Sequence, residues 1–282
     1  MAIAKITVLG AGTMGHGIAH AAIAGGYATR MYDVSDEAVA RGRGAIEQIV
    51  RKGVELGKLS APEADAMLAR LSATPSLSEA LHDADLVIEA APERIDLKLA
   101  LFAQIEAHAP AAALIGSNTS ALSITELAGS LKNPSRAAGM HFFNPVHKMK
   151  LVEIVRALES APAALEAIDE VARRMGKETV LVRESPGFIT TRVNASIGNE
   201  AFYMLMEGVA SARDIDKALK LGLNHPMGPF ELVDLVGLDT RLNNLRYLEQ
   251  TLGPLYKPSP LIEKLVKDGR LGKKSGKGVY EY

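Results

Sequence analysis

Short apolar runs alternate with segments of helical period along the first two thirds of the chain. Residues 3–9 form a β-rich run, and small residues then lead to a second strand-like run at 28–32. Residues 35–71 are expected to be helical, because apolar residues recur at helical spacing with charges between them. Further predicted strands are 85–90, 113–115, 137–140, 151–155 and 179–182. This alternation predicts an α/β fold with a doubly wound, mostly parallel sheet.

The pattern changes after Pro186. From there to the C-terminus the periodicity predicts helices, at 188–209, 212–221, 229–251 and 259–268. Ser211, followed by Asp214, is typical of a helix start. A length of 282 residues also favours two domains. We therefore predict an α/β domain over residues 1–184 and a smaller all-α domain over residues 185–282.

Composition and charge exclude several classes of function. The 32 basic and 33 acidic side chains give a net charge of −1, which offers no global electrostatic attraction for nucleic acid. The chain has no cysteine, which excludes disulfides, thiolate metal sites and a nucleophilic thiol. No run of 18 apolar residues is present, and Lys5, His16 and His20 interrupt any leader-like segment. We expect a cytoplasmic protein that binds neither nucleic acid nor membrane.

The first chemical motif is the sequence Gly10-Ala11-Gly12-Thr13-Met14-Gly15, called the glycine loop below. It follows a predicted strand, opens a helix, and precedes Asp33 at the end of the next strand. In such a loop the glycines allow a tight turn, a close approach of pyrophosphate and close helix packing. Asp33 would accept hydrogen bonds from ribose hydroxyls and repel a 2′-phosphate. The alternative is a purely structural turn, but the context predicts a Rossmann-type domain that binds NAD.

His141 is the candidate base that alcohol oxidation by a nicotinamide requires. It closes a predicted strand, and such strand ends build the sites of doubly wound sheets. Glu153 lies in the apolar run Leu-Val-Glu-Ile-Val, where a carboxylate is costly unless it is paired. We expect the two side chains to pair, either as a catalytic unit or as a buried structural contact. His16 and His20 stand four residues apart without a following Glu, so no metal site is expected.

Ser117-Asn118-Thr119-Ser120 follows another predicted strand and gathers hydroxyl and amide groups. Such residues are favoured as helix caps. They could also contact a substrate, because the loop falls at the strand ends, and the two roles are compatible.

Taken together, these motifs resemble the short-chain L-3-hydroxyacyl-CoA dehydrogenase family, of the bacterial 3-hydroxybutyryl-CoA dehydrogenase type. The resemblance spans essentially the whole chain. Its motifs are the glycine loop, Val-Ile-Glu-Ala-Ala-Pro-Glu at 87–93, Ser-Asn-Thr-Ser at 117–120, His-Phe-Phe-Asn-Pro at 141–145, Pro-Gly-Phe at 186–188, Met-Gly-Pro-Phe-Glu-Leu at 227–232 and Gly-Lys-Lys-Ser-Gly-Lys-Gly at 272–278.

The resemblance implies NAD-dependent oxidation of an (S)-3-hydroxyacyl-CoA to the 3-oxoacyl-CoA. It implies that His141 takes the 3-hydroxyl proton, that Glu153 orients the imidazole, and that Ser120 lies near the reacting oxygen. It also implies a homodimer formed through the helical domain, which would close over the substrate. Further residues that it places at the cofactor are Glu93, Lys98, Asn144 and Lys274, with Asn144 also beside the substrate.

Two features are specific to the substrate side. Many relatives read Pro-Gly-Phe-x-x-Asn-Arg, whereas this chain has Thr191 in place of the substrate-contacting Asn. A Thr hydroxyl donates one hydrogen bond but is shorter and β-branched, and Asn194 one turn on could partly substitute. Lys52 and Lys58 could meet the phosphates of CoA, although a solvated helix face is as good an interpretation.

Three other functions compete with this one. A dehydrogenase of a free hydroxy acid would use the same fold and differ in not requiring CoA. Ser120, His141 and Glu153 also suggest a hydrolase triad. However, the chain lacks a Gly-x-Ser-x-Gly elbow, and a hydrolase would have no use for a dinucleotide site. A dinucleotide-binding protein without catalysis is the third, and Thr191 is the residue that favours it.

Overall fold

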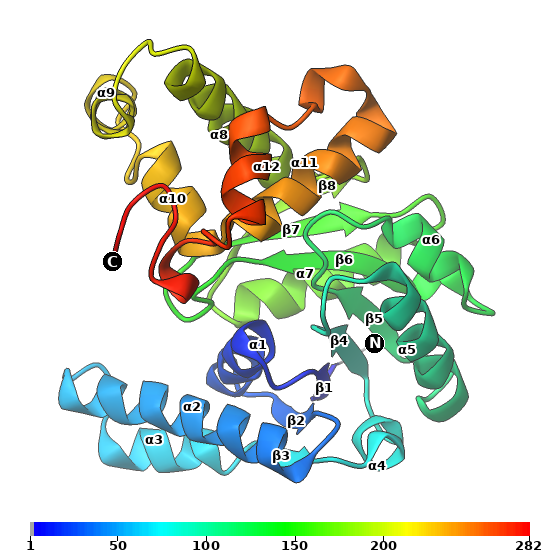
Figure 1. Ribbon diagram of the computed structural model, residues 1–282. Coiled ribbons are helices and arrows are strands. Elements are labelled where there is room, and N and C mark those ends of the chain that lie inside the picture. The colour runs from blue at the N-terminus through cyan, green and yellow to red at the C-terminus, as the bar shows by residue number, and fades with distance from the viewer. Residues whose placement is uncertain (1–2) are drawn as a thin grey trace. The chain divides into compact units, whose positions relative to one another are not determined.

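The computed structural model describes residues 3–282 and divides them into two compact units. The first unit ends at Glu184 and the second extends from Ser185 to Tyr282 (Figure 1).

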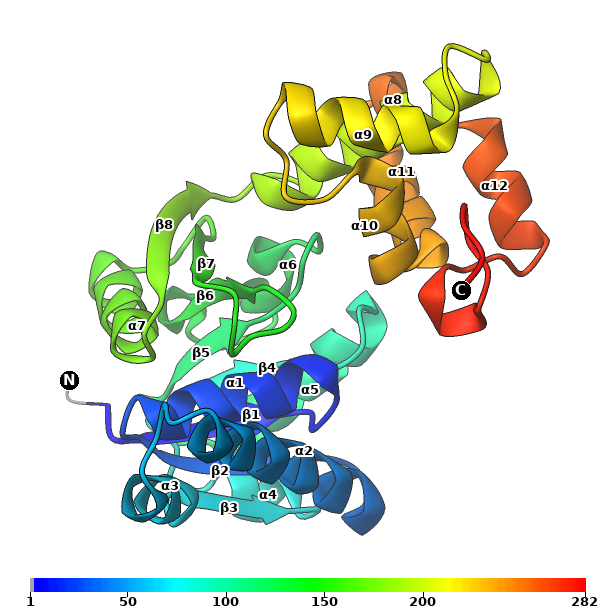
Figure 2. The ribbon, with the colours of Figure 1, turned by 90° about the vertical axis from the view of Figure 1, so that its left-hand side faces the viewer.

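Eight strands form one sheet within the described part of the first unit. Its order is β3-β2-β1-β4-β5-β6-β7-β8. All neighbours are parallel except β6 and β7, which are antiparallel (Figure 2). This confirms the doubly wound, mostly parallel sheet. The strands are β1 Lys5–Leu9, β2 Ala28–Tyr32, β3 Leu71–Thr74, β4 Leu86–Glu89, β5 Leu114–Ser117, β6 Ala137–Phe142, β7 Leu151–Arg156 and β8 Glu178–Arg183.

Helices cover both faces of this sheet. One core joins the strands to α1, α2, α3 and α7, and a second core joins them to α4, α5 and α6. Apolar side chains on both faces of the central strands explain why β4 is buried at every position. The helices are α1 Thr13–Ala24, α2 Asp36–Glu55, α3 Ala61–Leu68, α4 Leu77–Leu81, α5 Ile95–His108, α6 Ile124–Gly129 and α7 Pro162–Arg174.

The prediction of one helical segment over residues 35–71 was wrong in detail. Gly57 has a φ of +66°, which favours glycine and ends the first helix just after α2. Ser60 then begins α3 with a capping box that Glu63 completes. The segment ends in β3, an edge strand. This strand has only four residues, and only the first and the last are buried, so no alternating apolar pattern predicted it.

The second unit is helical within its described residues, apart from isolated bridges near the C-terminus. The predicted helix over 229–251 is instead two helices, because Gly237 adopts a φ of +111° between them. Ser211 does cap its helix, accepting a hydrogen bond from the Asp214 backbone N–H. The helices are α8 Thr190–Met206, α9 Ala212–Gly222, α10 Pro229–Val236, α11 Leu238–Leu252 and α12 Pro260–Lys267.

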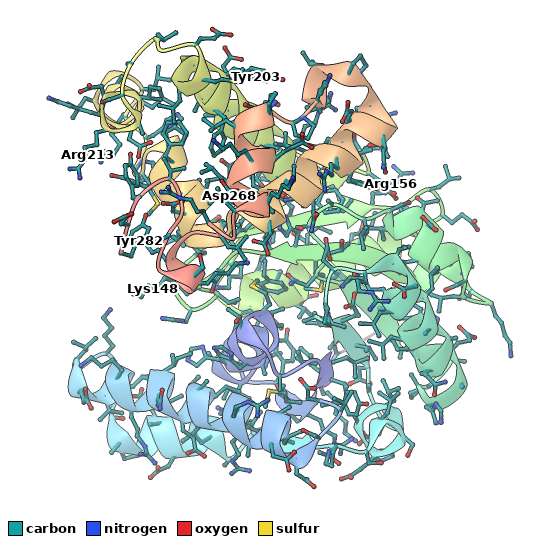
Figure 3. All side chains as sticks on the ribbon, in the orientation of Figure 1. Lys148, Arg156, Tyr203, Arg213, Asp268 and Tyr282 are labelled. Carbon is teal, nitrogen blue, oxygen red and sulfur yellow. The ribbon has the colours of Figure 1, made fainter. Side chains whose placement is uncertain are left out.

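Two buried aspartates fasten the C-terminal tail to the second unit. The Asp234 carboxylate accepts hydrogen bonds from the backbone N–H groups of Val279 at 2.8 Å and Tyr280 at 2.9 Å. It also accepts the Tyr282 hydroxyl at 3.0 Å, and Tyr282 is labelled in Figure 3. Asp216 accepts the Tyr280 hydroxyl at 2.7 Å. Burial, followed by the bond to Asp216, raises the pKa of Tyr280. The tail is thus an integral part of the helical unit.

Arg241 is a buried cation whose removal is expected to stabilise the protein. Its side chain is 3% exposed, and its Nε has no hydrogen-bond partner within residues 3–282. Burial lowers the pKa of Arg241 to about 10. An Arg241→Met substitution keeps the bulk and removes the desolvation cost, so we expect a gain of about 1–4 kcal/mol in the free energy of unfolding. Urea titration measures it, and a loss of stability would contradict this account.

Arg246→Met is the matched control on the same helix. Arg246 is half-exposed and donates to Glu263 at 3.1 Å. Exposed ion pairs contribute little, so its free energy of unfolding should change by less than about 1 kcal/mol.

Candidate active site

Each glycine of the glycine loop has a distinct environment. Gly10 has a φ of +108°, and an added Cβ would lie 2.7 Å from the Ala90 carbonyl oxygen. An added Cβ on Gly15 would lie 1.8 Å from the Gly10 carbonyl oxygen, so α1 packs directly against the loop. Gly12 differs, because nothing lies within 4 Å of its Cβ position. The first and third glycines are therefore required by packing, while the second leaves open space beside the backbone.

The start of α1 suits an anion. Gly12 is its N-cap, no side chain caps the helix, and no acidic residue stands in its first turn. The backbone N–H groups there remain available, and the helix dipole favours negative charge at this end.

Asp33 is held rigidly beside the glycine loop. Its Oδ2 accepts from the Ala11 N–H at 2.8 Å and its Oδ1 from the Val34 N–H at 2.7 Å. A pocket of about 250 Å³ opens between Gly12, Thr13 and Asp33 on one side and α2 on the other. The open face of Gly12, the uncapped helix and the fixed carboxylate fit the pyrophosphate and ribose of a dinucleotide.

His141 and Glu153 are cross-strand partners in the antiparallel pair β6 and β7. Residues directly opposite each other in such a pair have Cβ atoms about 5 Å apart. The His141 Nδ1 lies 2.6 Å from Glu153 Oε2, with His141 6% exposed and Glu153 fully buried. Sheet register therefore builds the contact that the sequence only suggested. The carboxylate thereby engages Nδ1 of the imidazole and fixes the orientation of the ring.

Glu93 organises the loop that carries Ser120. Its Oε1 accepts from the Thr119 hydroxyl at 2.7 Å, the Ser120 backbone N–H at 2.8 Å and the Ser120 hydroxyl at 3.0 Å. Glu93 follows β4 and Ser120 follows β5, which are neighbouring parallel strands. One carboxylate thus fixes two loops at the same edge of the sheet. The structure places Glu93 as a support of Ser120, and a contact of Glu93 with the cofactor stays a prediction.

Lys98 lies in a buried ion pair that the sequence analysis missed. Its Nζ donates to Glu89 Oε1 at 2.6 Å and to the Ala91 carbonyl oxygen at 3.1 Å. Lys98 is 1% exposed and Glu89 is fully buried. The Ser117 hydroxyl satisfies the other Glu89 oxygen at 2.6 Å. Glu89 ends the apolar run Leu-Val-Ile-Glu, which is the same signal that singled out Glu153. A role of Lys98 at the cofactor also stays a prediction.

Two further supports lie at the ends of the strands. Asn118 accepts the Phe142 backbone N–H at 2.9 Å and so joins the loop after β5 to the end of β6. Glu184 accepts the Ser123 hydroxyl at 2.5 Å and the Thr125 backbone N–H at 2.8 Å, at the start of α6. Asn118 belongs to the predicted polar loop at 117–120, but its contact with Phe142 was not predicted, nor was the contact of Glu184 with Ser123. Both contacts join residues far apart in the chain.

The other predicted site residues lie as follows. Lys52 is exposed and donates to Glu55 at 2.9 Å, and Lys58 is also exposed, as a solvated helix end would be. Asn144 is exposed in the connection between β6 and β7. In the second unit, Thr191 is half-buried in the first turn of α8, and Lys274 donates to Asp239 at 2.6 Å. Their roles toward cofactor or substrate remain predictions.

His20, on α1, is expected to make the fold acid-sensitive. Its Nδ1 is buried without a hydrogen-bond partner among the described residues. Burial lowers the pKa of His20 to about 4, helped by the charges of His147, Lys177 and His16. The unfolded chain therefore binds this proton more readily, so stability is complete above pH 6.5 and is lost as the pH falls toward 4. We expect a loss of up to about 2 kcal/mol between pH 7 and pH 5.

Urea titrations at the two pH values measure this effect. A His20→Asn variant should lose less stability on acidification than the parent protein. His82→Gln, at a side chain that is 59% exposed, should retain the full loss. Equal pH dependence of His20→Asn and the parent protein would show that another group is responsible.

Residues 3–282 lack two features that would indicate other classes of protein. They contain no cluster of three or more His, Asp or Glu side chains that could hold a metal ion. None of their helices combines the length and apolar character needed to cross a membrane.

The fold and site define a dinucleotide-dependent oxidoreductase, with a glycine loop, a carboxylate fixed beside that loop and a His–Glu pair at the strand ends. Residues 5–185 match the family model described as 3-hydroxyacyl-CoA dehydrogenase, NAD binding domain. Residues 187–282 match the C-terminal domain of the same enzyme. The chain belongs to the 3-hydroxyacyl-CoA dehydrogenase family, which confirms the resemblance and the NAD cofactor.

Individual relatives agree with this family. The chain is 44% identical to a probable 3-hydroxybutyryl-CoA dehydrogenase of Bacillus subtilis, over 100% of this chain and 98% of that protein. It is 42% identical to the 3-hydroxyadipyl-CoA dehydrogenase of Escherichia coli, over 99% of this chain and 59% of that protein. The crystal structure of (S)-3-hydroxybutyryl-CoA dehydrogenase from Ralstonia eutropha superposes with a TM-score of 0.96 at 40% identity, covering 100% of this chain and 99% of that one.

Proposed function

We propose that this protein oxidises short-chain (S)-3-hydroxyacyl-CoA thioesters, such as 3-hydroxybutyryl-CoA, to 3-oxoacyl-CoA. The observation that carries the proposal is the buried contact of 2.6 Å between His141 and Glu153 at the end of β6. A base held in this way suits the removal of a hydroxyl proton. Relatives that share more than a third of the sequence along its whole length are named for this substrate.

The residues divide the chemistry between them. His141 Nε2 accepts the proton of the substrate 3-hydroxyl as the alcohol becomes a ketone. Glu153 fixes the ring orientation through Nδ1 and stabilises the imidazolium that forms. NAD, when bound, supplies the acceptor for the hydrogen that leaves carbon 3 with its electron pair. In the reverse direction His141 returns its proton to the developing alkoxide.

Ser120 is proposed to contact the reacting oxygen. Glu93 holds both its backbone and its hydroxyl, so the side chain does not have to become ordered when substrate binds. Thr191 is proposed to take the place of the amide that relatives use on the substrate side. Its shorter reach should affect KM and chain-length preference more than the class of reaction.

A series of substrates tests this proposal. Turnover with NAD is measured on 3-hydroxyacyl-CoA of four, six, eight and more carbons, and on free 3-hydroxybutyrate. We expect kcat/KM to be highest for the short thioesters and negligible for the free acid. Equal or faster oxidation of the free hydroxy acid would instead assign the protein to that class. Binding of NADH without turnover of any acyl-CoA would support the non-catalytic alternative.

We also propose that the protein is a cytoplasmic homodimer that associates through its helical unit. That unit exposes several large apolar side chains, namely Met206, Val209, Leu221, Leu223 and Leu255. A contiguous exposed apolar patch marks a site of association, so these side chains are the candidates for the contact. Light scattering should give a mass near twice 30.0 kDa, and a monomeric mass at micromolar concentration would contradict the proposal.

A further inference from the structure

The cofactor pocket contains basic groups that NAD binding does not require. Its lining includes Asp33 together with Arg41 on α2 and His16 on α1. Arg41 stands eight residues after Asp33, in the second turn of the helix that follows β2. The pocket therefore places an acidic side chain and a guanidinium around one volume, on the side where the adenosine ribose of a dinucleotide would bind.

Packing fixes the position of Arg41 relative to the glycine loop. A Cβ added to its neighbour Gly42 would lie 2.7 Å from the Ala11 Cβ and 2.8 Å from the Ala11 carbonyl oxygen. Helix α2 thus lies directly against the glycine loop, in which the Ala11 N–H donates a hydrogen bond to Asp33. Asp33 and Arg41 are attached to backbone segments in contact with each other, so their relative placement is a property of the fold.

The charge environment suits a phosphate monoester. Arg41 is exposed, and no carboxylate of residues 3–282 lies within ion-pair distance of it, although its charge acts on Glu37 one turn earlier. Arg43 on the same helix binds Glu47 at 3.2 Å. A guanidinium presents a planar set of donors that matches phosphate oxygens. Asp33 has the opposite effect, because its carboxylate repels such a group while it accepts ribose hydroxyls.

We propose that Asp33 and Arg41 act as a selectivity pair, in which Arg41 forms a site for a 2′-phosphate on the adenosine ribose and Asp33 excludes that phosphate. The pocket would then contain a group able to bind the 2′-phosphate of NADP(H), and the Asp33 carboxylate would prevent that binding. This inference rests on dinucleotide binding by the first unit and is independent of the acyl-CoA that the protein oxidises.

A double-mutant cycle of Asp33 and Arg41 tests this proposal. The dissociation constants of NADH and NADPH are measured for each variant by fluorescence titration, without any acyl-CoA. Asp33→Ser should tighten NADPH binding by at least about tenfold, the value of one charge-assisted hydrogen bond. Asp33→Ser combined with Arg41→Ala should lose that gain. Arg41→Ala alone should change NADH binding by less than about threefold, because Arg41 is not needed for a ribose hydroxyl.

The control is Arg43→Ala in the Asp33→Ser background, which should keep the tighter NADPH binding because Arg43 points to Glu47. Asp33→Asn serves as a nearly isosteric second variant if Asp33→Ser lowers the melting temperature. A gain that persists without Arg41, or no gain in either Asp33 variant, would overturn the proposal. Failure of the acyl-CoA assays would leave these binding results unaffected, so the two proposals fail separately.

Discussion

Replacing His141 with Gln is expected to lower kcat by about 10²- to 10⁴-fold, the usual contribution of a positioned general base. The amide of Gln fits the same space but cannot take up a proton at neutral pH. NADH should still bind with nearly unchanged affinity, because the glycine loop and Asp33 belong to other strands of the sheet. Steady-state turnover of acetoacetyl-CoA with NADH, together with a fluorescence titration of NADH, measures both quantities.

His147→Gln is the matched control, since His147 is an exposed residue of the following connection. It should keep turnover within about threefold of the parent protein, as an exposed substitution away from the reacting atoms does. Glu153→Gln should lose most of the turnover and also alter the pH profile, because the neutral amide no longer stabilises the imidazolium. A His141→Gln variant with an unchanged rate would show that the base lies elsewhere.

Replacing Lys98 with Met is expected to destabilise the first unit by about 3–5 kcal/mol. The substitution leaves the Glu89 carboxylate charged and fully buried, with Ser117 and the Ala91 N–H as its remaining donors. The denaturant midpoint of unfolding measures this cost. Adding Glu89→Gln should recover a large part of it, because the double variant no longer buries an uncompensated charge.

The exposed pair of Lys52 and Glu55 provides the comparison for that experiment. Lys52→Met should change the free energy of unfolding by less than about 1 kcal/mol, because solvent screens an exposed ion pair. If Lys98→Met were equally mild, the buried pair would not support this edge of the sheet as described.

Local patterns predicted the cofactor half well, because its signals lie close together in the sequence. The glycine loop and Asp33 belong to one strand–helix–strand unit, so spacing alone indicated their shared role. The apolar residues around Glu153 indicated a buried carboxylate that needs a partner. His141 was a sound choice of partner because it stands at a strand end, but the register that brings them together comes from the pairing of β6 with β7.

Contacts between distant segments could not be predicted in the same way. The Glu93 carboxylate binds Ser120 across 27 residues, and Glu89 binds Ser117 across 28. Polar loop residues have no periodicity that reports such contacts. The break at Gly237 was missed for a different reason: apolar residues continue at helical spacing through it, and only the positive φ of that glycine separates α10 from α11.

We propose that the NAD-binding unit and the His141–Glu153 pair together oxidise and reduce carbon 3 of a short acyl-CoA. The measurement that tests it most directly is the loss of NADH absorbance when the purified protein is mixed with acetoacetyl-CoA. We expect steady, protein-dependent consumption of NADH with formation of (S)-3-hydroxybutyryl-CoA, and loss of that consumption in His141→Gln. No consumption of NADH by a folded protein that binds NADH would contradict it.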